Sequence, residues 1–214
     1  VRILENLNYK DAQYILIARE EHMETEKESI REIENEYNAV FHPIGHLTEG
    51  AACTVLHARN FINNNEPMII ANSDQIVDIN FQDFVNDCLA RELDGSIMTF
   101  KDPEKNTKWS FAKIDSNGNV NEVREKVPIS NLATVGIYMY SQGKYFIDAA
   151  LDMIVQNDRV NNEFYVCPVY NYAIKNKNRI GVYDIPFEKM HGLGTPEDLS
   201  VYRKLRNRWN VLYH

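Results

Sequence analysis

Four short segments of the chain carry residue types that could take part in chemistry. In the first, an apolar run over 67–71 leads into Asn72, Ser73 and Asp74. Ligands of open α/β sheets bind beyond the carboxyl ends of the strands, and a carboxylate there can hold Mg²⁺ against substrate phosphates. The alternative interpretation is that Ser73 and Asp74 only cap the next turn.

The second segment places small residues at the start of an expected helix. Gly50, Ala51 and Ala52 come soon after the second expected strand. Free backbone N–H groups and the lack of bulk would allow a base, a ribose or a phosphate to approach closely. The same small residues could instead serve the packing of the helix against the sheet.

The third segment ends a strand with Glu125 and Lys126, followed by Val127 and Pro128. This pair offers one acceptor for hydroxyl groups and one cation for a phosphate. Neighbouring residues of a strand face opposite sides, so joint use of the two side chains requires a twist or a bulge. An exposed, charged strand edge is the simpler interpretation.

The fourth segment is a glycine-containing loop before a helix start. His191 precedes Gly192 and Gly194, and Thr195 and Pro196 then form an expected N-cap and first helical position. His191 could contact a phosphate or a metal, or it could be a structural histidine with a satisfied hydrogen bond. The remaining histidines have no spacing that suggests a metal site.

The elements that must position these residues follow an alternating pattern. Apolar periodicity predicts strands near 13–18, 40–44, 67–72 and 95–100, with helices over 20–38, 51–62 and 81–91 between them. Later come expected strands at 108–114, 120–126, 135–140 and 180–184, and helices near 142–156, 164–176 and after 195. Alternating strands and helices favour one α/β domain with a parallel sheet and a mixed later half.

The composition narrows the class of protein. The chain has 214 residues and a net charge of −8, so binding of nucleic acid by a basic surface is not expected. No stretch has the length and apolarity of a membrane span or the order of a signal peptide. The three scattered cysteines, Cys53, Cys88 and Cys167, read as reduced thiols, which predicts a cytoplasmic protein.

In its order of motifs, the chain resembles the sugar-phosphate nucleotidyltransferases, also called nucleotide-diphospho-sugar pyrophosphorylases. The resemblance spans about residues 1 to 202. It rests on five motifs in sequence: Gly-Ala-Ala at 50–52, Asn-Ser-Asp at 72–74, Glu-Lys-x-Pro at 125–128, Ala-Thr-Val-Gly-Ile-Tyr at 133–138, and Gly-x-Gly-Thr-Pro-Glu-Asp-Leu at 192–199. It implies a Rossmann-like fold shared with GT-A glycosyltransferases, in which helices flank a mixed, mostly parallel central sheet.

The resemblance also implies roles for individual residues. The segment Gly50, Ala51 and Ala52 would pack against the nucleobase, and Asp74 would bind Mg²⁺ near the nucleotide phosphates, beside Asn72 and Ser73. Glu125 and Lys126 would bind the sugar hydroxyls and the sugar phosphate. Ser110, which stands where the family usually has glycine, would lie near the sugar, and Gly136 beneath it. The tripeptide 163–165 resembles the Glu-x-Tyr entry to a late helix.

Two departures from the family pattern stand out. The opening strand and Gly-rich loop, whose basic residues grip the triphosphate, do not occur in the chain. We therefore expect that the sequence is a fragment of a single domain spanning 1–214, with this N-terminal part missing. The second metal-binding aspartate of the family falls at Gly192. Either the neighbouring His191 takes its place, or a second metal is absent.

The function implied is transfer of a nucleotidyl group from an NTP to a sugar phosphate or a similar phosphorylated metabolite, for capsule or surface polysaccharide synthesis. Pyrophosphate would be released, Mg²⁺ would be the cofactor, and Asp74 and Lys126 would carry the catalysis. Homo-oligomers are conceivable. Two alternatives remain open: a GT-A-type glycosyltransferase that uses a nucleotide sugar, and a non-catalytic nucleotide- or sugar-binding relative.

Overall fold

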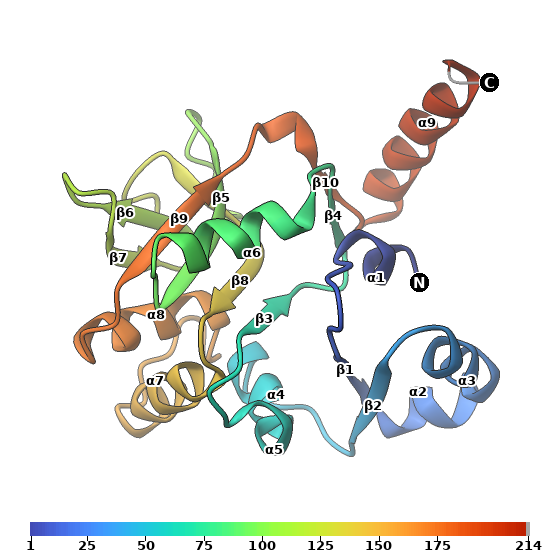
Figure 1. Ribbon diagram of the computed structural model, residues 1–214, viewed down its shortest axis with the longest axis horizontal. Coiled ribbons are helices and arrows are strands. Elements are labelled where there is room, and N and C mark those ends of the chain that lie inside the picture. The colour runs from blue at the N-terminus through green and yellow to red at the C-terminus, as the bar shows by residue number, and fades with distance from the viewer. Residues whose placement is uncertain (213–214) are drawn as a thin grey trace.

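A computed structural model describes the backbone of residues 1–212 and the side chains of residues 1–205. Its N-terminal part is a small unit of its own (Figure 1). After the short helix α1 (Arg2–Asn6), strands β1 (Tyr14–Arg19) and β2 (Ala39–Ile44) pair in parallel in a two-stranded sheet. The helix expected over 20–38 is interrupted at Glu26 and forms α2 (Glu20–Thr25) and α3 (Lys27–Glu36).

The main sheet has six strands around the central strand β8 (Leu132–Tyr140). All nine residues of β8 are buried, as in a strand covered on both faces. The others are β3 (Met68–Ala71), β5 (Gly95–Lys101), β6 (Phe111–Ile114), β7 (Val120–Arg124) and β9 (Ile180–Asp184), in the order β7-β6-β8-β5-β9 with β3 also paired to β8.

The mixed α/β class is confirmed, but the expected pairing within the main sheet needs a correction. Strands β3, β5, β6 and β9 share one direction, as the expected alternation predicts. The central strand β8 runs against them, so β3, β5 and β6 all pair with it in antiparallel fashion, and β5 with β9 is the parallel pair. Hydrogen-bonded neighbours are therefore mostly antiparallel, because β8 enters the sheet from the hairpin-rich later half of the chain.

Helices cover both faces of this sheet. One core packs beneath α4 (Ala51–His57), α7 (Gly143–Val155) and α8 (Val166–Lys175), and the other beneath α6 (Phe81–Ala90). Side chains of β8 alternate between the two cores: Tyr138 and Tyr140 enter the first, and Ile137 and Met139 the second. The helix expected over 51–62 is divided at Ala58, where the short helix α5 (Arg59–Ile62) begins.

Two short strands were not predicted. Strand β4 (Gln75–Val77) pairs with β10 (Met190–Gly192) in an antiparallel two-stranded sheet. The 3-10 helix η1 (Phe187–Lys189) leads into β10, and helix α9 (Pro196–Leu212) then projects away from the body of the molecule (Figure 1). The segment 74–77 is thereby tied to the glycine-containing loop at 191–194.

Candidate active site

The carboxyl end of β3 meets a bulge in the central strand. Ile97 of β5 pairs with Tyr138 of β8, but Thr99 pairs with Thr134, so β8 has two extra residues in this interval. Gly136 lies in the bulge and has a φ of +92°. The Asn72 N–H donates to the Gly136 carbonyl at 3.1 Å. A Cβ atom at Gly136 would lie 2.4 Å from Asn72 Nδ2 and 2.5 Å from Gln75 Oε1. The absence of a side chain at Gly136 therefore makes the space in which these two amides lie.

Gln75 was not among the predicted site residues. Its side chain is buried, and Oε1 has no hydrogen-bond partner among the described residues. A buried acceptor without a partner costs free energy unless something else satisfies it. The signal in the sequence was present but weak, since Gln75 directly follows Asp74 and precedes two apolar residues.

Asp74 lies in the loop between β3 and β4, with its side chain exposed. Its carbonyl accepts the Leu193 N–H at 2.7 Å, which fixes the loop 191–194 beside it. A Cβ atom at Gly194 would stand 2.8 Å from Asp74 Oδ2. The glycine therefore lets the loop approach the carboxylate closely. Ser73 is exposed on the same loop.

His191 is engaged by a side chain that was not predicted. Its Nε2 lies 2.7 Å from Asp78 Oδ2, and its ring lies 5.4 Å from the ring of Tyr202, centroid to centroid. The imidazole thus has a structural partner on one nitrogen. A Cβ atom at the neighbouring Gly192 would lie 3.8 Å from Asp198 Oδ2, so a carboxylate from α9 reaches the place where the family has its second aspartate.

The Gly50 segment packs against a distant loop. Gly50 has a φ of +125°, and a Cβ atom there would lie 2.5 Å from the backbone N and O of Phe164. Two backbone hydrogen bonds join the segments: Ala52 N–H to the Phe164 carbonyl at 2.9 Å, and Phe164 N–H to the Glu49 carbonyl at 2.8 Å. Ala51 is exposed, whereas Ala52 is wholly buried. Ala51 is thus available to a ligand, and Ala52 is part of the core.

Glu125 is a buried carboxyl group with one named partner. Its side chain is 8% exposed, and Ser110 Oγ, also buried, donates a short hydrogen bond to Oε2. Burial raises the pKa of Glu125, and the Ser110 hydrogen bond and the charge of Lys126 oppose that shift. Cys167 and Tyr138 lie in the same buried group of side chains, where burial raises the pKa of both. Ser110 thus fixes the orientation of the carboxyl group.

Lys126 turns away from the strand that Glu125 follows. Strand β7 ends at Arg124, and Lys126 has a φ of +56°, which is the left-handed region. Its exposed ammonium donates to the Tyr165 hydroxyl at 3.2 Å, and this hydrogen bond raises the pKa of Lys126. The bend that joint use of Glu125 and Lys126 requires is therefore present. One side chain is directed into the core, and the other reaches Tyr165.

These contacts connect the predicted residues into one chain of neighbours. Phe164 touches the Gly50 segment, and the next residue, Tyr165, touches Lys126. Ser110 holds Glu125, and its carbonyl accepts the Thr134 N–H, two residues before Gly136. His191 lies in β10, which pairs with β4. Its side chain hydrogen-bonds to Asp78, which was not a predicted site residue.

Comparison with known proteins identifies the family. The sequence profile described as Nucleotidyl transferase matches residues 2–197. The chain belongs to this family. Glucose-1-phosphate adenylyltransferase of Clostridium acetobutylicum is 26% identical over 125 residues, which are 56% of this chain and 32% of that protein. The chain spans about a third, or less, of the length of the curated relatives it matches.

Solved structures confirm the fold of this nucleotidyl transferase family member. The nucleoside-diphosphate-sugar pyrophosphorylase of Vibrio cholerae RC9 superposes with a TM-score of 0.76 at 21% identity, over 90% of this chain and 80% of that one. The inositol-1-phosphate CTP transferase of T. maritima gives a TM-score of 0.66 at 11% identity, over 89% and 74% of the two chains. The profile match thus confirms the resemblance inferred from the motifs, and these structures confirm the fold class.

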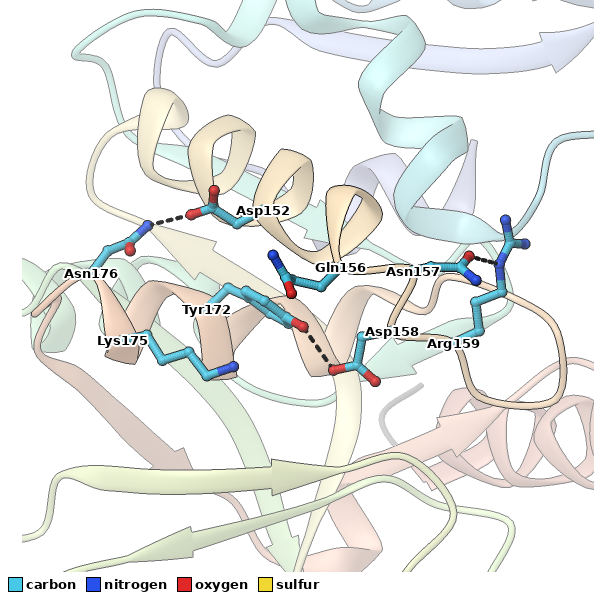
Figure 2. A pocket seen from close by; sticks show the side chains of 8 residues that line it. All are labelled: Asp152, Gln156, Asn157, Asp158, Arg159, Tyr172, Lys175 and Asn176. Atoms are coloured by element: carbon cyan, nitrogen blue, oxygen red, sulfur yellow. Dashed lines mark hydrogen bonds between the residues drawn. The ribbon is translucent and has the colours of Figure 1, made fainter.

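The protein also has a hollow at the carboxyl ends of α7 and α8, apart from the predicted site residues (Figure 2). Its polar groups largely bind one another. Tyr172 donates to Asp158 at 2.9 Å, and Asn176 donates to Asp152 at 3.0 Å. No predicted site residue lines it, and its groups do not converge on an empty centre. The carboxyl end of β3, and not this hollow, is therefore the candidate active site.

Two further observations bear on the family member as a whole. None of the helices that the structure describes is long and apolar enough to cross a membrane. Cys88 and Cys167 are buried, and Cys53 is half-buried in α4. Burial raises the pKa of the Cys88 thiol to about 12 and also raises the pKa of Cys53.

Proposed function

We propose that the protein transfers a nucleotidyl group from an NTP to the phosphate of a phosphorylated sugar. An oxygen of the acceptor phosphate attacks the α-phosphorus, a new P–O–P bond forms, and the bond to the leaving pyrophosphate breaks. The observation that carries the proposal is the contact of Phe164 and Tyr165 with both the Gly50 segment and Lys126. Transfers of this kind depend on positioning and on charge neutralisation more than on a covalent nucleophile.

Every predicted residue except Ala52, which belongs to the core, then has a task. Gly50 and Ala51 admit the nucleobase, with Asn72 and Ser73 beside the nucleotide, while Gly136 lies in the strand beneath the sugar. The ammonium of Lys126 holds the attacking phosphate, for which a mobile point charge suffices. Glu125, oriented by Ser110, accepts hydrogen bonds from sugar hydroxyls. His191 acts through its loop, which is fixed to Asp74 by the Leu193 N–H.

Asp74 is suited to hold Mg²⁺. Its carboxylate is exposed at the carboxyl end of β3, and the lack of a side chain at Gly194 lets the loop 191–194 lie close beside it. The described residues contain no group of three or more metal-ligating side chains. Mg²⁺ commonly takes one or two carboxylates and completes its shell with water and substrate phosphates, so the site fits this ion. Bound there, Mg²⁺ would neutralise charge on the reacting phosphates.

We further propose that the natural protein supplies the triphosphate grip from an N-terminal strand and Gly-rich loop. Within the described residues, β1 and β2 form a sheet separate from the main one, and β3 pairs on one edge only, with β8. Edges of this kind accept another strand. The nucleotide sugar made by such an enzyme would serve surface polysaccharide synthesis.

The test is a pyrophosphate-release assay on the protein with its natural upstream sequence, over four NTPs and a panel of sugar phosphates. Asp74→Asn should lower the rate by roughly 10²-fold or more, because metal charge stabilisation contributes several kcal/mol. Asp148→Asn, an exposed position on α7, is the matched control and should leave the rate unchanged.

Two results would overturn the proposal. An unchanged rate in Asp74→Asn would refute the metal assignment. Release of a free nucleoside diphosphate from a nucleotide sugar, without pyrophosphate from an NTP, would identify a glycosyltransferase in its place.

A further inference from the structure

Arg159 lies in the loop between α7 and α8 and makes an unusual number of contacts for a surface arginine. Nε donates to Asn157 Oδ1 at 2.7 Å, and one terminal nitrogen donates to the Asn162 carbonyl at 3.1 Å. The other terminal nitrogen binds the Glu49 carboxylate in a short contact. The guanidinium also lies over the ring of Phe164, 4.1 Å from its centroid. All its nitrogens are thus committed to neighbours.

The loop that Arg159 occupies is held in an unusual backbone shape. Asn157, Asn161 and Asn162 all have a positive φ, a conformation that costs free energy unless the surroundings impose it. Two of these three residues accept a hydrogen bond from Arg159. Figure 2 shows the guanidinium directed away from Asp158 and Tyr172, toward a different part of the molecule. Arg159 lines the hollow, but its guanidinium braces its own loop on the side away from Asp158 and Tyr172.

The contact with Glu49 links Arg159 to the Gly50 segment. It directly precedes Gly50 and lies 110 residues from Arg159 in the chain. The two backbone hydrogen bonds between Glu49, Ala52 and Phe164 run alongside the ion pair. Glu49 is 66% exposed, so the ion pair alone would contribute little to stability. Its effect is geometric, because the planar guanidinium contacts Glu49 and Phe164 simultaneously.

The far side of the same loop reaches the substrate lysine. Tyr165, next to the Phe164 ring that Arg159 covers, accepts the hydrogen bond from Lys126 at 3.2 Å. An unbroken path of contacts therefore leads from the Gly50 segment through Glu49, Arg159 and Phe164 to Lys126. The path thus joins the two segments to which the proposed function assigns the nucleotide and the acceptor phosphate.

We propose that Arg159 is a positioning residue that sets the distance between the Gly50 segment and Lys126. The functional part of this inference rests on the proposed nucleotidyl transfer, and the structural part does not. Arg159 touches neither substrate. It acts by fixing the loop 157–165 against residues 49–52, which suits a reaction in which small displacements of the reactants cost much of the rate.

The structural part is tested by hydrogen exchange on the full-length protein. In Arg159→Gln, the amides of Ala52 and Phe164 should exchange ~10-fold faster, while amides of β5 and β8 keep their rates, because only the local contact is lost. Glu49→Gln should give the same pattern. Arg91→Gln is the matched control, since Arg91 also binds one carboxylate and one carbonyl, at Asp87 and Val182. Unchanged exchange at Ala52 and Phe164 in Arg159→Gln would overturn the proposal.

The functional part is tested by steady-state kinetics with an NTP and a sugar phosphate. Arg159→Gln should raise the KM for the NTP and lower kcat, each by ~10-fold, because both partners lose their alignment. Arg159→Lys, which keeps the charge toward Glu49, should recover part of the loss. The double variant Glu49→Gln/Arg159→Gln should be no worse than Arg159→Gln alone, as expected for two residues that act through one contact.

The two proposals fail in different ways. Kinetic constants of Arg159→Gln equal to those of Arg91→Gln would overturn the positioning role even if turnover is high. If the wild-type protein releases no pyrophosphate, the proposed function fails, and the exchange experiment still decides whether Arg159 holds the two segments together.

Discussion

Glu125 combines two demands that oppose each other. Its carboxylate is the acceptor proposed for sugar hydroxyls, yet it is 8% exposed and lies near the buried Cys167 and Tyr138. Burial raises the pKa of Glu125 above its usual 4.5. The folded protein therefore holds the proton more tightly than the unfolded chain does, and carrying a charge at neutral pH costs stability at this position.

Replacing the charge should make the protein more stable and less active. As pH rises above 4.5, the unfolded chain loses the Glu125 proton first, so the free energy of unfolding falls until the folded state has also lost it. Glu125→Gln removes this loss and keeps the acceptor for Ser110. The stability gain of the variant should therefore grow with pH across this window, as measured by urea unfolding at several pH values. Glu122→Gln, in the strand β7 that Glu125 follows, should show no such growth.

Gly136 offers a second test at this scale. Gly136→Ala should destabilise the protein by about 3 kcal/mol or more, because a positive φ and a collision with Asn72 and Gln75 add together. Gly118→Ala is the control. Gly118 also has a positive φ, of +78°, but no atom lies within 4 Å of its Cβ position, so about 1 kcal/mol is expected. Equal losses in urea unfolding would mean that the space at Gly136 is not constrained as described.

Among the elements, β8 depends on one side chain of α8. The Tyr170 hydroxyl lies 2.9 Å from the Met139 carbonyl and 3.2 Å from the Ser96 carbonyl, so it bridges β8 and β5. The ring stacks on Tyr140 with centroids 4.6 Å apart. The helix is therefore fixed to the sheet close to the point where the bulge at Gly136 begins.

Tyr170→Phe keeps the stacking and removes the bridge. We expect a loss of about 1–3 kcal/mol in the free energy of unfolding, because buried carbonyl groups lose a donor. Tyr183→Phe is the control, since the Tyr183 hydroxyl has no hydrogen-bond partner in the part of the chain that the structure describes, and it should change little. A Tyr170→Phe variant as stable as the control would show that the bridge contributes nothing net.

The sequence was informative about elements wherever apolar periodicity continued over several residues. The strands of the main sheet and helices α6 to α8 were predicted near their observed places. Strands β4 and β10 are three residues long, too short for periodicity to register, and their pairing unites segments far apart in the chain. The reversed direction of β8 likewise depends on where the later hairpins dock, which local pattern does not encode.

The site was predictable to the extent that it consists of sequence motifs. Asp74, Gly50 and Glu125 lie in recognisable segments, and the structure shows a bend at Lys126 that makes joint use of Glu125 and Lys126 possible. Arg159 belongs to no motif, and its importance arises from Glu49 and Phe164, which only folding brings to it. Asp78, as the partner of His191, was hidden for the same reason.

At the scale of the whole molecule, three histidines lie where the N-terminal unit meets the main body. The ring of His57 at the end of α4 lies 6.4 Å from that of His42 in β2 and 5.7 Å from that of His46, between centroids. Burial, followed by the charges of His46 and His42, lowers the pKa of His57 below 6.5. The folded state therefore favours the neutral ring.

Acid should weaken this junction. As pH falls through about 6.5, the unfolded chain takes up the His57 proton before the folded state does. The free energy of unfolding therefore decreases toward low pH, and the contribution of His57 to it is complete above that range. His57→Gln should flatten the dependence of the melting temperature between pH 7 and 5. His22→Gln, at an exposed position in α2, is the control and should leave the slope unchanged. An unchanged slope in His57→Gln would rule out this role for the cluster.

The uneven burial of the three cysteines allows one of them to be labelled selectively. Cys88 and Cys167 are closed off in the two cores, whereas Cys53 is half-buried near the start of α4, directly after Ala52. A maleimide dye applied to the native protein should therefore label one position without any engineered substitution. Because that position adjoins the segment proposed to receive the base, the emission of the dye would report the arrival of each nucleotide in real time.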